Sequence, residues 1–355
     1  MKVTNRNGDD RVKVDELSGM LRVVAPEVIE ILESRYQILN IVNYLQPIGR
    51  RSLSTKLEMT ERVIRKEANL LKDQGLLDFS LEGMTLTDQG ERILNALKFF
   101  FHDLKGLKAL EERLETLLNV KKVIIAPASP EDEPSMTIKD IGRFGAEYVQ
   151  SIIANSSIVG ITGGSSVHSV IDSIKKEKSA LSTLTVVPAR GGLGKKADFQ
   201  ANTLVEKFAN ALGSQYKLLY TPDLLSKDAI DSLMNEPEIK EILEYIEKID
   251  LLIFGIGDAL TMAKRRSLNS EEIGIIETKG AVSEAFGYYF NREGEIVHEI
   301  STIGISLEKF KNIENLIAVA GGDDKSEAIV SICRLNQNLV LVTDENVARN
   351  IINIF

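Results

Sequence analysis

The chain has 355 residues, of which 43% are hydrophobic and 27% are charged, a composition typical of a folded globular protein with about two domains. Its single cysteine, Cys333, excludes an intrachain disulfide and favours a reducing compartment. The sequence shows neither the roughly 18 consecutive apolar residues of a membrane helix nor the pattern of a signal peptide. We therefore expect a cytoplasmic protein that does not bind a membrane.

Charge is unevenly distributed along the chain. The net charge of −9 argues against a nucleic-acid partner for the molecule as a whole. The segment 35–75 nevertheless carries eight basic and four acidic residues, which indicates one specialised basic surface. The three histidines, His102, His168 and His298, are far apart in sequence, so no metal site is expected.

The amino-terminal part has the pattern of three helices followed by a hairpin. The predicted helices span 35–45, 50–58 and 60–74. Thr60 suits the N-cap position of the third helix. Two short β-rich runs, 76–80 and 84–87, flank a glycine and predict a β-hairpin. This order of elements is typical of a winged helix-turn-helix domain.

The third predicted helix carries a mostly basic stripe opposite its apolar face. The stripe consists of Arg62, Arg65, Lys66 and Asn69. Arginine pairs well with guanine, asparagine with adenine, and lysine neutralises phosphate. Such a stripe alone is more often an ordinary solvated surface. Its place in the third helix, directly before a hairpin, favours DNA binding, with Arg50 and Arg51 as further candidates for contacts to the DNA backbone.

Leucines recur at helical spacing through the segment 88–119, which predicts a long helix. This spacing suits either packing within the chain or a seam between subunits. The expected organisation is a polar extension and lead-in over 1–30, a winged-helix domain over 31–90, a linker helix over 91–119 and an effector domain over 120–355.

From about residue 120, short β-rich runs alternate with longer helical stretches, which predicts an α/β architecture around a parallel sheet. The runs that precede glycine-rich or polar loops are 157–161, 184–189, 251–254, 316–320 and 339–342. The carboxyl ends of parallel strands share one edge of the sheet, where α/β proteins bind their ligands.

The loop from Thr162 to Ser166 combines two glycines and two serines at a predicted helix start. Glycines let backbone amides approach an anion, and the helix terminus adds a positive dipole end. The loop has no Walker lysine and no dinucleotide-binding fingerprint. Glycine also serves such turns for steric reasons alone, but Arg190, Arg265 and Lys325 favour an anionic ligand.

Four segments carry a more specific pattern. They are Pro47–Ser52 (PIGRRS), Pro188–Gly194 (PARGGLG) with Gln200–Asn202 (QAN), Glu284–Phe290 (EAFGYYF) and Ala320–Lys325 (AGGDDK). These motifs resemble those of the SorC-type sugar-sensing transcriptional regulators, over about residues 36–350. The resemblance implies a winged-helix domain and a Rossmann-like effector domain similar to sugar-phosphate isomerases and glucosamine-6-phosphate deaminases. It also implies a repressor of a glycolytic operon that is tetrameric on DNA and is released by fructose 1,6-bisphosphate.

The resemblance further implies which residues contact the sugar phosphate. They are Gly163, Gly164, Ser165, Ser166, Arg190, Gln200, Asn202, Arg265, Glu284 and Lys325. Three cations suit two phosphates, and the amide and carboxylate side chains suit sugar hydroxyls. Glu284 equally suits a buried ion pair with one of these cations.

The sequence thus predicts a non-enzymatic repressor that binds operator DNA as a homo-oligomer, with fructose 1,6-bisphosphate as effector and no other cofactor. One alternative is a sugar-phosphate isomerase or deaminase, since fold alone does not decide function. Glu284 and Asp258 suit acid–base roles, but no Asp/Lys/His constellation accompanies them. A second alternative is a repressor that senses a different sugar phosphate.

Overall fold

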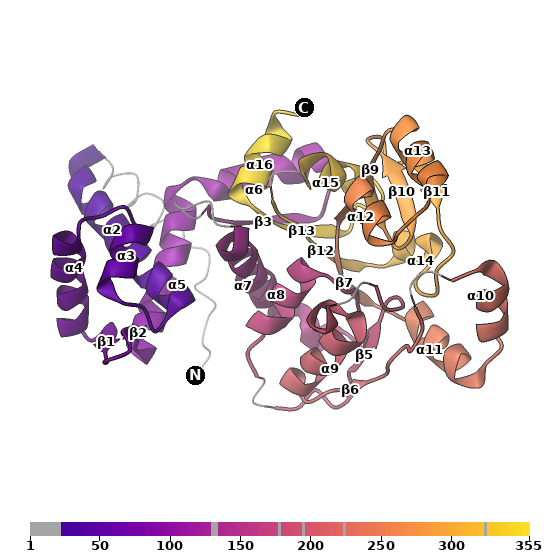
Figure 1. The fold of residues 1–355 in the computed structure, drawn as a ribbon, viewed down its shortest axis with the longest axis horizontal. Coiled ribbons are helices and arrows are strands. Elements are labelled where there is room, and N and C mark those ends of the chain that lie inside the picture. Colours follow the sequence, from indigo (N-terminus) through magenta and orange to yellow (C-terminus); the bar gives the residue numbers. More distant parts are fainter. Residues whose placement is uncertain (1–22, 129–133, 177–178, 194–195, 223–224, 323–324) are drawn as a thin grey trace, which may run out of the picture. The chain divides into compact units, whose positions relative to one another are not determined.

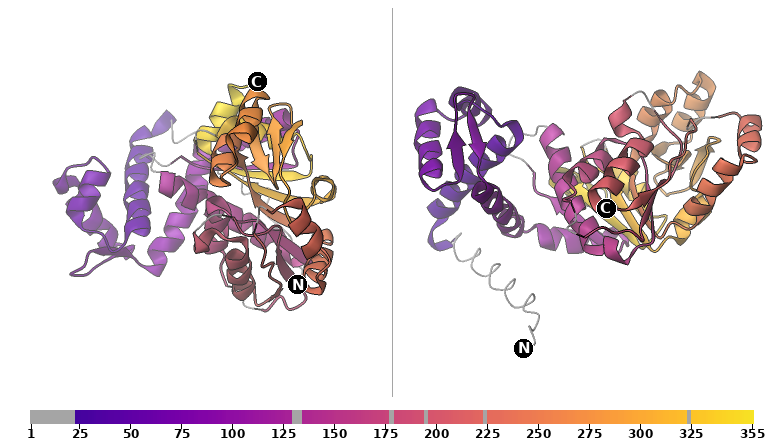
Figure 2. Two further views of the ribbon diagram at one scale, coloured as in Figure 1. Left: turned by 45° about the vertical axis from the view of Figure 1, so that its right-hand side comes forward. Right: turned by 90° about the horizontal axis from the view of Figure 1, so that it is seen from below.

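A computed structural model describes residues 23–128, 134–176, 179–193, 196–222, 225–322 and 325–355 (Figures 1 and 2). These residues fall into two compact units: the first holds the described residues up to Ala109 together with Pro134–Met136, and the second holds Leu110–Ala128 and the described residues from Thr137 onward. Residues 1–22 of the extension and lead-in expected over 1–30, Gly194 and the Asp323–Asp324 pair lie outside the described residues. Within the described ranges, no helix has both the length and the apolar character needed to cross a membrane.

The first unit is a winged helix-turn-helix (Figure 1). Its helices are α2 (Pro26–Leu45), α3 (Arg50–Lys56), α4 (Glu61–Asp73) and α5 (Asp88–Leu104). The strands β1 (Leu77–Phe79) and β2 (Met84–Leu86) form an antiparallel hairpin directly after α4. Ile48 pairs with Met84 and adds a third short extended segment beside the hairpin. The predicted order of elements is confirmed.

Helix α2 begins earlier than the predicted start at Arg35. Its first turns leave Val28 and Ile31 exposed, and the buried side chains of the helix begin only at Ile38. A prediction that depends on the burial pattern therefore misses these turns. Thr60 caps α4 as predicted, because its Oγ1 accepts a hydrogen bond of 3.4 Å from the Val63 amide.

The segment predicted as one linker helix over 91–119 consists of two helices. Helix α5 ends at Leu104, and α6 spans Leu107–Leu118. Gly106 between them has a φ of +67°, a left-handed conformation that ends a helix and that glycine adopts without strain. Leu107 and Leu114 are fully buried in the single chain, which favours packing within the chain for these leucines.

The second unit is built around a parallel sheet of seven strands with the order β3-β13-β12-β7-β4-β5-β6. The strands are β3 (Lys122–Ala126), β4 (Ile158–Ile161), β5 (Thr185–Pro188), β6 (Gln215–Tyr216), β7 (Leu251–Gly255), β12 (Asn315–Val319) and β13 (Leu339–Asp344). From β4 the chain moves outward to β5 and β6, and then returns to place β7 on the other side of β4. The α/β prediction for this part of the chain is confirmed.

Helices cover both faces of this sheet (Figure 2). The helices that follow α6 are α7 (Pro134–Ile152), α8 (Ser165–Ser173), α9 (Ala201–Leu212), α10 (Lys227–Leu233), α11 (Pro237–Glu247), α12 (Ala259–Arg265), α13 (Ser270–Thr278), α14 (Leu307–Asn312), α15 (Ser326–Cys333) and α16 (Glu345–Ile352). Of these, α10, α12 and α13 do not lie on the large sheet. Ile253 faces the core that α7, α8 and α9 complete. Phe254, the next residue along β7, packs against Phe310 of α14 on the opposite face.

A second, antiparallel sheet was not predicted. Its order is β11-β10-β9-β8, with β8 (Gly257–Asp258), β9 (Ala281–Ala285), β10 (Tyr288–Asn291) and β11 (Ile296–Glu299). It is inserted between β7 and β12 in the chain and packs against α12 and α13. This small sheet carries Glu284 to the carboxyl edge of the large sheet.

Candidate ligand site and nucleic-acid interface

A cavity opens where the carboxyl ends of β4, β5 and β7 meet. The strand order reverses at this point, because the chain leaves β4 in one direction and returns to its other side at β7. Crevices of this kind are the usual ligand sites of open α/β sheets. The structure brings nine of the ten predicted contact residues together at its walls: Gly163, Gly164, Ser165, Ser166, Arg190, Gln200, Arg265, Glu284 and Lys325.

The loop after β4 has a backbone that only glycine allows. Gly164 has a φ of +125°, and a Cβ on Gly163 would lie 2.5 Å from the Phe199 carbonyl oxygen. Helix α8 begins immediately afterwards at Ser165. Within the described part of the chain, no side chain caps its first turn, so the amides there are available to an anion beside the hydroxyls of Ser165 and Ser166.

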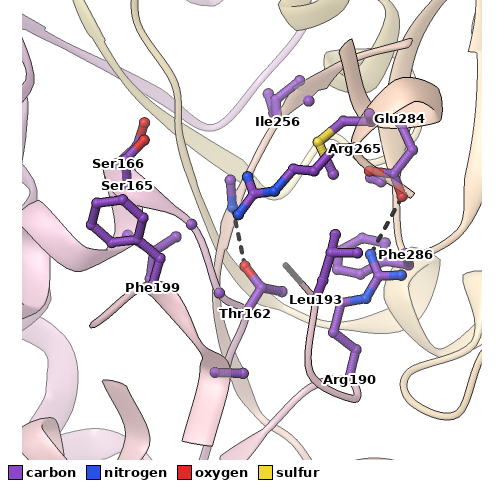
Figure 3. Close-up of a pocket in the computed structure, with 18 of the residues that line it drawn as sticks. Thr162, Ser165, Ser166, Arg190, Leu193, Phe199, Ile256, Arg265, Glu284 and Phe286 are labelled. Atoms are coloured by element: carbon purple, nitrogen blue, oxygen red, sulfur yellow. Dashed lines mark hydrogen bonds and ion pairs between the residues drawn. The ribbon is translucent and has the colours of Figure 1, made fainter. Parts of the chain in front are cut away.

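Arg190 and Glu284 lie on the side of the cavity opposite the serines (Figure 3). The Glu284 carboxylate is buried, and its Oε1 accepts from Nη1 of Arg190 at 3.3 Å. The same oxygen accepts from Nη2 of Arg266 at 2.9 Å and from the Gly287 amide at 2.7 Å. Burial alone would raise the pKa of Glu284, but the two guanidinium groups outweigh it and hold this pKa below its usual range.

Lys325 and Arg265 add two further cationic groups at the cavity. Lys325 is half-buried, and its Nζ donates to the Ile256 carbonyl oxygen at 2.9 Å. Burial lowers the pKa of Lys325, as does the nearby charge of Arg265, whereas Asp258 acts in the opposite direction. The Arg265 side chain is exposed to solvent. The cavity therefore presents cationic groups on more than one wall.

The two predicted amide contacts differ in position. Gln200 lines the cavity, and its Nε2 donates to the Leu193 carbonyl oxygen at 2.8 Å. Asn202 is not among the described residues that line the cavity. Its amide is paired with the backbone of Leu219 in both directions, at 3.1 Å each. Asn202 thus fixes the start of α9 to a neighbouring segment, and the structure does not bring it to the ligand site.

Arg266 and Phe286 are functional-site residues that sequence reasoning missed. Arg266 lies behind Glu284, with a side chain that has 0% exposure. Phe286 lines the cavity in a left-handed conformation at the turn between β9 and β10. Phe286 lies within the Glu284–Phe290 motif, but only Glu284 of that motif was predicted to contact the ligand. Arg266 has no sequence signal of its own, because only the fold brings the end of α12 to Glu284.

The predicted recognition helix has the expected two faces. Ile64, Ala68 and Leu71 of α4 are buried in the core of the first unit. The stripe of Arg62, Arg65, Lys66 and Asn69 is exposed. A helix in this position, with its cations in solvent and a hairpin beside it, has the geometry to enter the major groove of DNA.

Neighbouring residues order part of this surface. Nη2 of Arg50 donates to Oδ1 of Asn69 at 3.2 Å, and its guanidinium lies 5.0 Å from the centre of the Phe79 ring in β1. Arg51 pairs with Glu61 at 3.1 Å. Lys66 is 3.8 Å from a Glu67 oxygen. The Arg50 guanidinium is therefore placed between Asn69 and Phe79 on this surface.

Family models match nearly the whole chain in two parts. The "CggR N-terminal DNA binding domain" matches residues 31–101, and the "Putative sugar-binding domain" matches residues 102–353. The fold is similar to that of the full-length sorbitol operon regulator SorC of Klebsiella pneumoniae, with a TM-score of 0.66, 19% identity and coverage of 91% of this chain and 98% of that one. A solved structure described as a "putative SorC family transcriptional regulator from Enterococcus faecalis" is 30% identical, with a TM-score of 0.63 and coverage of 69% of this chain and 99% of that one. The chain belongs to the SorC-type family of sugar-binding transcriptional regulators.

Two relatives indicate the branch of this family. The central glycolytic genes regulator of Bacillus subtilis is 38% identical over 339 residues, which cover 96% of this chain and 99% of the relative. The protein of the same name from Priestia megaterium is also 38% identical, over 335 residues that cover 94% and 97% of the two chains. The chain thus combines a DNA-binding domain with a sugar-binding domain.

Proposed function

We propose that this protein represses a glycolytic operon and that fructose 1,6-bisphosphate, bound in the cavity of the second unit, releases it from operator DNA. The observation that carries the proposal is the pairing of an open helix terminus at Ser165 with cations on other walls of the same cavity. The names of the two relatives supply the link to glycolysis. A regulator of this kind acts in the cytoplasm, where its operator lies.

Two phosphate groups fit the distribution of charge better than one. The loop with Ser165 and Ser166 offers amides and hydroxyls to the first phosphate. Arg190, Arg265 and Lys325 offer charge to the second. Because each wall supplies its own donors, a ketose that carries a phosphate at either end bridges the cavity. Glu284 contributes by holding Arg190 at the wall.

An isomerase or deaminase activity fits the cavity poorly. Glu284 is the one acidic side chain among the described residues that line it. Its Oε1 already accepts three hydrogen bonds, and its lowered pKa makes it a weak base. Asp258 instead caps α12, where its carboxylate accepts from the Thr261 amide at 2.8 Å. We therefore propose a binding site without catalysis.

Isothermal calorimetry with fructose 1,6-bisphosphate, fructose 6-phosphate and inorganic phosphate tests this proposal. Wild type is expected to bind the bisphosphate at least about tenfold more tightly than either other ligand, because only the bisphosphate engages both walls. Ser166→Glu is expected to abolish binding through repulsion of phosphate by a carboxylate. Lys325→Ala is expected to weaken binding of the bisphosphate.

Ser270→Glu is the matched control, because Ser270 is the exposed first residue of α13, at another helix start outside the cavity. It is expected to bind like wild type. Equal affinities of wild type for mono- and bisphosphate would contradict the two-phosphate proposal. Unchanged ligand binding by Ser166→Glu would show that the serine loop does not contact the phosphate. Turnover of any sugar phosphate would revive the enzyme alternative.

A further inference from the structure

Arg266 lies outside the cavity but contacts the residue that holds Arg190 at its wall. It is the C-cap residue of α12. Its Nη2 donates to Oε1 of Glu284 at 2.9 Å, and its Nη1 donates to the Tyr289 hydroxyl at 3.3 Å. The Arg266 side chain has 0% exposure, compared with 9% for Arg190. The neighbouring Arg265, by contrast, lines the cavity directly.

Two guanidinium groups therefore share one oxygen of Glu284. The contact with Arg266 is shorter than the contact with Arg190, at 2.9 Å against 3.3 Å. Charge-assisted hydrogen bonds weaken as they lengthen, so Arg266 takes the larger part of the carboxylate charge. All three side chains are buried, and the low dielectric there strengthens the attraction between the Glu284 carboxylate and each guanidinium group.

We infer that Arg266 is a positioning residue for the anion site: it engages Glu284 so that Glu284 orients Arg190 without neutralising it. Loss of Arg266 would leave the carboxylate to Arg190 alone. Arg190 would then be drawn into a one-to-one ion pair, and its charge would no longer be available to a phosphate in the cavity. This inference rests on the proposed function, since it requires that the cavity bind a phosphorylated sugar.

The test is calorimetry with fructose 1,6-bisphosphate on four variants of the full chain. Arg266→Met removes the charge and is expected to raise the Kd on the order of tenfold. The double variant Arg266→Met/Glu284→Gln also removes the carboxylate charge that would neutralise Arg190. It is expected to bind more tightly than Arg266→Met and to recover most of the lost affinity. A role in packing alone predicts the opposite order, because the second substitution would add a second defect.

Lys264→Met is the matched control: it removes a cation from the same helix, but Lys264 is exposed and does not line the cavity. It is expected to bind within about twofold of wild type. Arg266→Lys keeps the charge and is expected to retain affinity within about threefold. If circular dichroism shows that Arg266→Met does not fold, the affinity of Arg266→Lys still tests the inference.

Either of two comparisons with Arg266→Met can overturn the inference. One is an affinity of Arg266→Met/Glu284→Gln that is no higher than that of Arg266→Met. The other is a loss in Arg266→Lys as large as the loss expected for Arg266→Met. Absence of binding of every sugar phosphate to wild type would instead overturn the proposed function, and the inference with it. Tight binding by both wild type and Arg266→Met would overturn the inference and leave the proposed function intact.

Discussion

At the scale of single residues, the ligand loop depends on the absence of a side chain at Gly163. A Cβ there would lie 2.5 Å from the Phe199 carbonyl oxygen, closer than real contacts allow. Gly163→Ala must therefore displace the loop or the segment at Phe199. We expect it to weaken binding of fructose 1,6-bisphosphate on the order of tenfold, by calorimetry, because phosphate donors are sensitive to small displacements.

Gly274→Ala serves as the control for that substitution. Gly274 lies inside α13, and an added Cβ there meets no atom within 4 Å among the described residues. It is expected to leave binding unchanged and to stabilise the fold slightly, since alanine favours a helix. Equal ligand affinities of the two alanine variants would contradict the close approach described for Gly163.

Arg62 and Arg65 are the residues on which DNA affinity is expected to depend most. Both are exposed on α4. Arg62→Ala and Arg65→Ala are each expected to cost about 1–3 kcal/mol of operator binding if they read bases, whereas Lys66→Ala is expected mainly to reduce the salt dependence. Gel-shift titrations at several salt concentrations separate these effects. Lys240→Ala is the charge-matched control, because Lys240 is exposed on α11. If the arginine variants bind DNA as tightly as this control does, Arg62 and Arg65 do not contact DNA.

Among the helices and strands, those whose signals lie within a short stretch of sequence were predicted correctly. The three helices and hairpin of the first unit follow from apolar spacing, a capping Thr60 and the turn at Gly83. The parallel strands follow from alternation of β-rich and helical segments. The antiparallel sheet was missed, although β10 pairs with its chain neighbours β9 and β11 across short turns that contain Gly287 and Gly294.

The same distinction applies to the site. The serine loop could be predicted, because it lies within five consecutive residues whose chemistry is visible in the sequence. The Arg190–Glu284 contact joins residues 94 positions apart, and Arg266 adds a third partner 18 positions from Glu284. Asn202 was predicted to contact the ligand because its side chain is of a suitable type, but its amide hydrogen-bonds to the backbone of Leu219 instead.

Thr60 provides a prediction for an element. Its Oγ1 satisfies the Val63 amide in the first turn of α4 at 3.4 Å, which is a long hydrogen bond. Thr60→Ala is therefore expected to lower the free energy of unfolding by only about 0.5–1 kcal/mol, measured by urea denaturation. Thr116→Ala, on an exposed position within α6, is the control and is expected to be neutral or slightly stabilising. A Thr60→Ala variant as stable as this control would contradict the capping role.

At the scale of the whole molecule, the net charge of −9 and the basic stripe of α4 coexist in one chain. DNA phosphates are thus expected to be attracted to the surface of α4, and a single recognition helix gains specificity when a second copy reads an adjacent half-site. We expect at least a dimer in solution and tetramers on operator DNA. Light scattering at micromolar concentration checks this expectation, and a monomeric mass both with and without DNA would contradict it.

Control of DNA binding by a sugar bisphosphate in the cavity requires the ligand to favour one of two states of the protein. Fluorescence anisotropy of a labelled promoter fragment from the glycolytic operon, titrated with protein at increasing fructose 1,6-bisphosphate, tests it most directly. Wild type is expected to lose at least about tenfold in DNA affinity at saturating ligand. Ser166→Glu is expected to bind DNA equally well with and without the ligand. A DNA affinity of wild type that does not change with bound bisphosphate would contradict the account.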